Sequence, residues 1–401
     1  MSDNDLVLAH VRLAGRAVDL GLRDGRIARI APAGTLHGRA VEACGGLLAL
    51  PGLVDGHIHL DKTFLGLPWV SHRPDGSVAG RIAAERAQLR AIAEPMAIRA
   101  RRLVEHIARR GTTAIRTHVD VDNDTGLAGL ETLLKLRDEV AHLLSMQIVA
   151  FPQSGVVSHP GGAAVLEDAI RAGADVVGGL DPAGIDDDVE AQLDIVFGIA
   201  ERHGVRIDIH LHDPGELGAW ELRRIASRSK AAGLQGRVAV SHAFALGTID
   251  EATLARTAAT LAEGGIAIMT NGPGPETMPP VKRLLAEGVQ VFVGSDNIRD
   301  AWSPYGNGDM LERARLVGYR GALLTDAELR LALDLVTTAP ARVIGLPDIT
   351  LVEGAAADLI LVDAAHEPEA VAGAPPRALV VKAGRVIARL SDQPPNRASL
   401  G

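Results

Sequence analysis

Eight short apolar runs, separated by longer amphipathic stretches, occupy the middle of this chain. They lie at residues 47–60, 112–121, 146–153, 174–182, 206–213, 237–243, 265–271 and 289–296. Short apolar runs that alternate with helix-like stretches are typical of repeated strand–helix units around a parallel sheet. Helices commonly end on glycine, and four runs begin just after Gly111, Gly173, Gly204 and Gly288. Eight such units predict an α/β fold, a (β/α)8 TIM barrel.

The two ends of the chain have a different pattern. Residues 5–30 alternate apolar and polar side chains around the turn-like sequence Arg23-Asp24-Gly25, and the alternation returns in 349–364 and 375–390. This pattern is typical of short antiparallel strands. We expect residues 1–50 to form the N-terminal part of a small β-sandwich, 51–345 the barrel, and 346–401 the C-terminal part of the sandwich and a tail. The 401 residues suffice for a barrel of ~250 residues and this second unit.

Composition and charge exclude several classes of partner. The net charge of -9 is spread along the chain, and the 41 Lys and Arg residues form no dense run. We therefore expect no nucleic-acid or membrane partner. No stretch reaches the ~18 apolar residues of a membrane helix, and the N-terminus lacks a signal-peptide pattern, so a cytoplasmic location is expected. Cys44 is the only cysteine, which leaves histidine and carboxylate as the ligands for any metal.

Histidines gather where predicted strands end. Five of the 14 lie at or beside these ends: His57, His59, His210, His212 and His242. The C-terminal ends of barrel strands form the active-site face, and alternate residues of one strand point the same way. Asp296 ends the eighth run, and imidazole with carboxylate is the ligand set of catalytic zinc or iron(II). We predict one divalent metal per chain, zinc ahead of iron(II), bound by His57, His59, His210 and Asp296.

Several segments carry a family resemblance. LPGLVDGHIHLDKTF (50–64) resembles the first-strand signature of the amidohydrolase superfamily, and VGSDNIRDAWSPYGNGDM (293–310) resembles the closing segment of its cytosine deaminase branch. IVAFPQSG, RIDIHLHD and VAVSHAFALG continue the match in order, over nearly the whole chain. Within that branch, the likeness is greatest to enzymes that remove an alkylamine from an s-triazine ring. The resemblance implies a homo-oligomeric enzyme that acts on a small nitrogen heterocycle.

The resemblance also implies roles for individual residues. Asp296 matches a residue that is both metal ligand and proton acceptor. His242 matches the histidine that hydrogen-bonds the attacking hydroxide, and Gln153 matches the glutamine that holds the substrate ring. His118, on the second run, is expected to lie near the ligands without binding the metal.

Three positions depart from cytosine deaminase. Asp213 replaces a glutamate that shuttles protons, Asn297 replaces an acidic residue, and Lys62 replaces an uncharged one. These departures favour a ring with carbonyl oxygens over cytosine. Lys62 is expected to stabilise charge on the ring, with a solvated loop lysine as the alternative. The donor of a proton to the leaving nitrogen is expected to be Asp296 or His212, and Asp213 stays open as the alternative to His212.

The sequence thus predicts an aminohydrolase or deaminase acting on carbon–nitrogen bonds other than peptide bonds. It would release ammonia or an alkylamine from an ammelide-like s-triazine or pyrimidine by attack of hydroxide formed at the metal. Asn297, and Trp69 and Trp302 on loops after the first and eighth runs, are expected to contact the ring. The alternatives are a cytosine deaminase, a cyclic amide hydrolase and a binding barrel without catalysis. A cyclic amide hydrolase commonly needs a bridging lysine on the fourth strand, and ADVVGGLDP has none.

Overall fold

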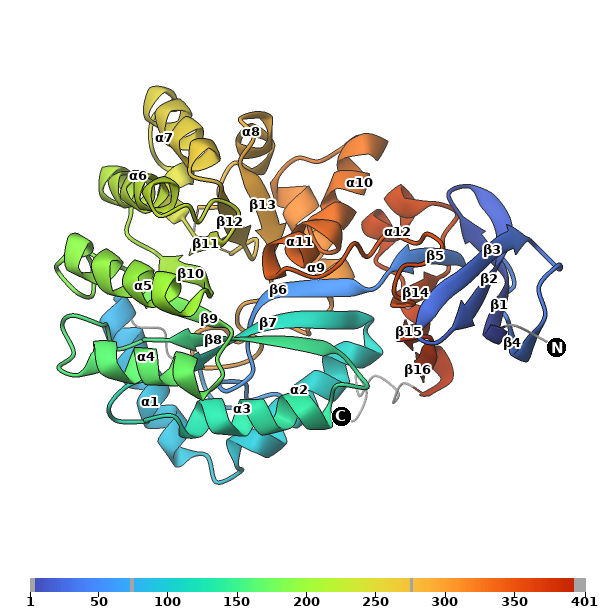
Figure 1. Ribbon diagram of the computed structural model, residues 1–401, viewed down its shortest axis with the longest axis horizontal. Coiled ribbons are helices and arrows are strands. Elements are labelled where there is room, and N and C mark those ends of the chain that lie inside the picture. Colours follow the sequence, from blue (N-terminus) through green and yellow to red (C-terminus); the bar gives the residue numbers. More distant parts are fainter. Residues whose placement is uncertain (1–3, 73–75, 275–276, 393–401) are drawn as a thin grey trace.

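Two sheets dominate the computed structural model, which describes residues 4–72, 76–274 and 277–392 (Figure 1). One sheet, which forms the barrel, has eight parallel strands that pair in chain order. They are β6 (Leu53–His59), β7 (Thr112–Asp120), β8 (Ser145–Phe151), β9 (Val176–Leu180), β10 (Arg206–Leu211), β11 (Val238–His242), β12 (Ile266–Thr270) and β13 (Gln290–Val293). Each predicted run overlaps one of them, which confirms the TIM barrel.

The barrel closes where the end of β13 meets β6. The closure is an isolated parallel bridge between Ile58 and Asp296, in which the backbone N–H of Asp296 donates to the carbonyl of His57 at 2.8 Å. Asp296 has φ of 59°, in the left-handed region that non-glycine residues seldom adopt. The closing contact therefore holds Asp296, which follows β13, beside the histidines of β6.

Helices surround the barrel sheet (Figure 1). They are α1 (Val78–Ala91), α2 (Met96–Arg109), α3 (Ala128–Glu139), α4 (Gly162–Ala172), α5 (Val189–His203), α6 (Gly215–Ala231), α7 (Glu251–Glu263), α8 (Val281–Ala286), α9 (Met310–Arg320), α10 (Asp326–Asp334) and α11 (Thr338–Ile344), with the short 3-10 turn η1 (Phe244–Gly247). A further helix, α12 (Glu367–Gly373), packs on α9 and α10, and the 3-10 turn η2 (Leu390–Asp392) lies at the second sheet. As predicted, α4 and α5 end on left-handed glycines, Gly173 and Gly204. Among the described residues, no helix is both long and apolar enough for a membrane span.

Both chain ends build the second sheet, where strands from the start and the end of the chain lie side by side (Figure 1). Its strands are β1 (Asn4–Leu13), β2 (Arg16–Arg23), β3 (Arg26–Pro32), β4 (Gly38–Ala43), β5 (Leu48–Pro51), β14 (Leu359–Val362), β15 (Arg377–Lys382) and β16 (Arg385–Arg389). They pair in the order β16-β15-β14-β5-β1-β2-β3, with β4 on β1. Leu8 and Leu20 from one end share an apolar core with Leu361 and Val381 from the other, which confirms the predicted β-rich unit.

One prediction about the strands was wrong. The run 47–60 is two strands rather than one: β5 pairs with β14 in the second sheet, and β6 belongs to the barrel. The chain changes sheets at Gly52, whose N–H donates to the carbonyl of Asp358 and where an added Cβ would lie 2.3 Å from Thr113. A side chain there would thus clash with β7. We retain 50/51 and 345/346 as proposed domain boundaries; the predicted tail, 393–401, lies outside the described residues.

Candidate metal centre and its cavity

Three of the four predicted ligands meet at the C-terminal end of the barrel. The Nε2 atoms of His57 and His59 are 3.3 Å apart, and Oδ1 of Asp296 lies 3.5 Å from each. All three side chains are buried, and their ligand atoms fit within the spacing of a single ion. His57 and His59 face the same way because they are two residues apart on β6.

His210, the fourth predicted ligand, lies at the edge of this group. Its ring centre is 4.6 Å from that of His57 and 5.5 Å from that of His59, and its ligand atom groups with those of His57 and His242. Neither of its ring nitrogens has a hydrogen-bond partner among the described residues. Burial lowers the pKa values of His210 and His59, so both imidazoles are neutral and offer lone pairs. Buried imidazoles without partners, beside a carboxylate, fit a divalent metal.

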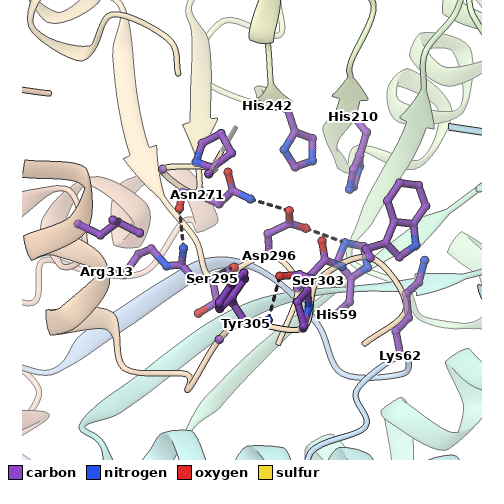
Figure 2. A pocket seen from close by; sticks show the side chains of 18 of the residues that line it. His59, Lys62, His210, His242, Asn271, Ser295, Asp296, Ser303, Tyr305 and Arg313 are labelled. Atoms are coloured by element: carbon purple, nitrogen blue, oxygen red, sulfur yellow. Dashed lines mark hydrogen bonds and ion pairs between the residues drawn. The ribbon is translucent and has the colours of Figure 1, made fainter. Parts of the chain in front are cut away.

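Asp296 is ionised despite its burial. Burial opposes its ionisation, but the neighbouring His242, His57 and His59 hold the pKa of this carboxyl well below its usual range. Its Oδ2 accepts from Nδ2 of Asn271 at 2.7 Å, and Arg313 in turn donates to the carbonyl of Asn271 at 2.7 Å (Figure 2). Sequence reasoning missed Asn271, although its place directly after β12, at the same barrel end, was an available signal.

His212 and His242 lie next to the metal centre and line the same cavity. Their rings stack with centres 4.6 Å apart. Nδ1 of His212 donates to Asp181 at 2.9 Å. Burial alone would lower the pKa of His212, but the Asp181 carboxylate raises it overall. His212 can therefore carry a proton at the wall of this cavity.

Asp213 lies beside α6, where it neighbours Glu221. Because β10 ends at Leu211, strand alternation no longer governs the residue, and its carboxylate accepts from the N–H of Gly184 at 3.0 Å. It is a close neighbour of Glu221 on α6, which is fully buried. Burial and the Asp213 carboxylate raise the pKa of Glu221 to about 8. Glu221 is therefore expected to hold a proton in the folded protein at neutral pH.

This protonated state predicts a stability difference that depends on pH. Between its ordinary pKa near 4.5 and about 8, Glu221 holds a proton in the folded chain that the unfolded chain lacks. Wild-type stability should therefore fall as pH rises from about 4.5 to about 8 and level off above this range. Glu221→Gln cannot ionise and should gain up to a few kcal/mol over wild type from about pH 6 to about pH 9. Denaturant unfolding across this range measures it. The control Glu201→Gln, at an exposed position of α5, should keep the wild-type slope; parallel slopes for Glu221→Gln and wild type would contradict the assignment.

Lys62 is not a solvated loop lysine. Its side chain is 2% exposed, and Nζ lies 3.0 Å from Asp120 and 3.3 Å from Glu85. It also donates to Oε1 of Gln153. Burial would lower the pKa of Lys62, but the Asp120 and Glu85 carboxylates raise it, so the ammonium remains charged.

Glu85 connects three loops around this lysine. It accepts from Nε2 of Gln153 at 2.7 Å and from Nε1 of Trp302 at 2.5 Å, in addition to its ion pair with Lys62. Nε2 of Gln153 also donates to Asp120 at 3.0 Å. Both N–H groups of Gln153 are therefore engaged, which leaves its carbonyl as the group with spare hydrogen-bonding capacity. Sequence reasoning missed Glu85, because it lies on α1, away from any strand end.

One cavity of about 1210 Å³ is lined by side chains of the metal centre and of the Lys62 cluster: His59, Lys62, Gln153, His210, His212, His242 and Asp296. It also contacts Asn297 and Trp302. Nδ2 of Asn297 donates to Asp300 at 2.8 Å. Trp69 is 66% exposed and is not among the residues that line the cavity. The prediction that it lines the pocket was wrong, because Phe64 and Leu65 are the last buried residues before the chain turns outward.

His118 lies close to the predicted ligand His57. It is fully buried, and its ring centre is 4.0 Å from that of His57. It does not belong to the group formed by His57, His59 and Asp296, but its ligand atom groups with those of His57 and Asp208. That His118 does not bind the metal stays a prediction.

Known proteins share this sequence and architecture. Residues 40–388 match the amidohydrolase family. The chain is 33% identical over 400 residues to N-isopropylammelide isopropyl amidohydrolase from Pseudomonas sp. (strain ADP), covering 96% of this chain and 98% of that protein. The solved structure of N-isopropylammelide isopropylaminohydrolase from Burkholderia multivorans superposes with a TM-score of 0.91 at 43% identity, over 96% of this chain and 98% of that one. A 5-methylcytosine deaminase from Klebsiella pneumoniae liganded with 5-fluorocytosine gives 0.85 at 30% identity, over 96% and 97%.

Proposed function

Since the chain belongs to the amidohydrolase family, we propose that it hydrolytically removes ammonia or an alkylamine from an ammelide-like nitrogen heterocycle, an s-triazine or a pyrimidine. The observation that carries this proposal is the meeting of His57, His59 and ionised Asp296 in one group. His59 and Asp296 line a cavity that is also lined by His212 and Lys62. Such a site combines metal ligands, a proton carrier and a fixed cation within reach of one small ring.

Asp296 is proposed to accept a proton from the attacking water. When bound by His57, His59, His210 and Asp296, a divalent metal would supply a water of lowered pKa. Asn271 holds one oxygen of the Asp296 carboxylate at 2.7 Å, while the other faces the two histidines of β6. The carboxylate is thus fixed in place and ionised before substrate arrives, as a general base must be.

His212 is proposed to donate the proton that the leaving nitrogen needs. Amines leave poorly as anions, so the nitrogen must be protonated before the carbon–nitrogen bond breaks. Asp181 holds Nδ1 of His212 and raises the pKa of the ring, so Nε2 can carry and release a proton. His242, stacked on His212, is proposed to hydrogen-bond the attacking water.

Lys62, Gln153, Asn297 and Trp302 are proposed to bind the ring. The buried ammonium of Lys62 favours carbonyl oxygens or negative charge on the substrate. The Gln153 carbonyl retains hydrogen-bonding capacity toward a ring N–H. Glu85 holds Lys62, Gln153 and Trp302 in a fixed arrangement before substrate binds.

Cytosine deamination remains the alternative function, because a 5-methylcytosine deaminase shares the architecture. Cyclic amide hydrolysis at a lysine-bridged pair of metals is disfavoured, since β9 (Val176–Leu180) is VVGGL and contains no lysine. We propose zinc ahead of iron(II) as the native metal. A homo-oligomeric state and a cytoplasmic location stay predictions.

A substrate screen tests the proposal. The protein, loaded separately with zinc and with iron(II), is incubated with ammelide, N-alkyl ammelides, cytosine, isocytosine and related pyrimidines, and released ammonia or amine is measured. We expect turnover of amino- or alkylamino-substituted dioxo rings in preference to cytosine. Tight ring binding without any amine release would instead support a binding barrel.

The preference for dioxo rings should depend on Lys62. Lys62→Met is expected to lower kcat/KM for ammelide-type rings by the equivalent of roughly 1.5 to 3 kcal/mol, the cost of losing a charge-assisted contact, while affecting cytosine less. Steady-state kinetics with both rings in both proteins give the ratio directly. The ratio of kcat/KM for the two rings does not depend on how much of the variant is folded. This matters because Lys62→Met leaves the Glu85 and Asp120 carboxylates without their cation.

Lys382→Met is the matched control. Lys382 is also buried and paired with a carboxylate, Asp358 at 2.6 Å, but it lies on β15 in the second sheet. It should leave the substrate ratio unchanged. An efficient cytosine deaminase whose substrate ratio is indifferent to Lys62 would contradict the proposed preference.

A further inference from the structure

A chain of buried polar contacts leads from the metal centre into the barrel interior. Nδ1 of His57 lies 2.9 Å from Oγ of Ser241, and this hydroxyl donates to Oδ1 of Asp208 at 2.8 Å. Nη1 of Arg116 donates to the other oxygen of Asp208 at 2.8 Å. All four side chains are at most 1% exposed, and they come from β6, β11, β10 and β7. We refer to Ser241, Asp208 and Arg116 as the positioning chain.

Counting donors and acceptors shows which group donates in each hydrogen bond of the positioning chain. Asp208 forms an ion pair with Arg116, so its carboxylate is an acceptor only. Ser241 has one hydroxyl proton, and it donates this proton in its hydrogen bond to Asp208. The Ser241 oxygen must therefore accept from His57, and the proton of a neutral His57 ring must lie on Nδ1. Nε2 is then left with its lone pair toward His59 and Asp296.

The buried ion pair between Arg116 and Asp208 is better explained by its role in orienting the hydrogen bonds to His57 than by a contribution to folding stability. A buried ion pair loses much of its hydration energy, and well-packed apolar residues often replace such a pair without loss of stability. Arg116 is nevertheless fully engaged in the barrel interior, where it also donates to Oε1 of Gln147 at 2.8 Å and to the carbonyl of Val343 at 3.1 Å. The barrel thus retains the buried carboxylate of Asp208, which is joined through Ser241 to the predicted ligand His57.

We propose that Ser241, Asp208 and Arg116 are positioning residues that fix the tautomer and ring orientation of His57 and thereby strengthen metal binding. The inference rests on the proposed metal-dependent function. Contacts of this kind behind a ligand histidine are generally worth 10- to 100-fold in metal affinity. None of the three residues needs to touch the substrate.

Metal affinity of Ser241 variants tests the proposal. Competition with a chromophoric chelator measures the zinc dissociation constant of each apo-protein. Ser241→Ala should weaken zinc binding roughly 10- to 100-fold, and Ser241→Thr, which keeps the hydroxyl, should bind within about threefold of wild type. The matched control is Ser229→Ala, because Ser229 is also fully buried and donates to the Gly264 carbonyl at 2.7 Å, but lies on α6. Its zinc affinity should equal that of wild type.

A second readout needs neither metal nor activity. With 15N-labelled histidine, NMR of the apo-protein should show His57 as one tautomer protonated at Nδ1, and Ser241→Ala should lose this single form. Wild-type zinc affinity in Ser241→Ala, or a wild-type His57 protonated at Nε2, would overturn the proposal. Failure of wild type to bind zinc or release amine would instead count against the proposed function, since the tautomer result is independent of both.

Discussion

Removal of the divalent metal is expected to abolish amine release, and zinc or iron(II) should restore it. The structure brings His57, His59 and Asp296 together in one group, with His210 at its edge, and β9 contains no lysine to bridge a second ion. We therefore expect about one tightly bound metal per chain. Metal analysis of the purified active protein, before and after chelation, measures both the content and its link to turnover. Two metals per active chain would contradict this prediction.

Asp296→Asn should reduce kcat more than about 10³-fold. The substitution removes both a ligand and the proposed proton acceptor, and general-base help alone is commonly worth 10²–10⁴. Asn keeps the shape of the side chain, so the closing contact between the backbone of Asp296 and His57 should survive. Asp326→Asn, at an exposed position at the start of α10, serves as the control and should retain full activity. Activity near the wild-type level in Asp296→Asn would rule out the assigned role.

His212→Ala is expected to lower turnover about 100-fold or more while most of the metal is retained. His212 lines the cavity and holds a proton through Asp181, which suits a donor to the leaving nitrogen. Asp213→Ala should do less damage, because Asp213 contacts Gly184 and neighbours Glu221. Kinetics with an N-alkyl ammelide, together with metal content, measure both variants.

The opposite order would identify Asp213 as the proton carrier. In that case the arrangement inferred from cytosine deaminase, with an acid three residues after His210, would apply. Loss of metal from His212→Ala would make its kinetics uninformative about proton transfer. His212→Gln, which keeps a donor toward Asp181, then separates metal loss from loss of the titrating ring.

Local patterns in the sequence determined the architecture of this protein. Eight apolar runs between amphipathic stretches sufficed for the barrel, because strand and helix formation respond to short-range periodicity. The pairing of His57 with His59 followed from strand alternation, and the places of His210 and Asp296 followed from the ends of their runs. These three histidines and Asp296 at the C-terminal barrel face were therefore foreseeable from the sequence, whereas Asn271 was missed.

The tertiary structure alone decided which side chains support these residues. Glu85 reaches Lys62, Gln153 and Trp302 from a helix with no strand-end signal. Together, the Asp120 and Glu85 carboxylates keep the buried Lys62 ammonium charged. Trp69 is exposed because the buried part of this segment ends at Leu65. The contacts from Arg116 through Asp208 and Ser241 to His57 join residues up to 184 positions apart. Sequence periodicity tells which face a residue occupies, but only barrel closure determines which faces meet, and hydrogen bonds need that final geometry to within a few tenths of an ångström.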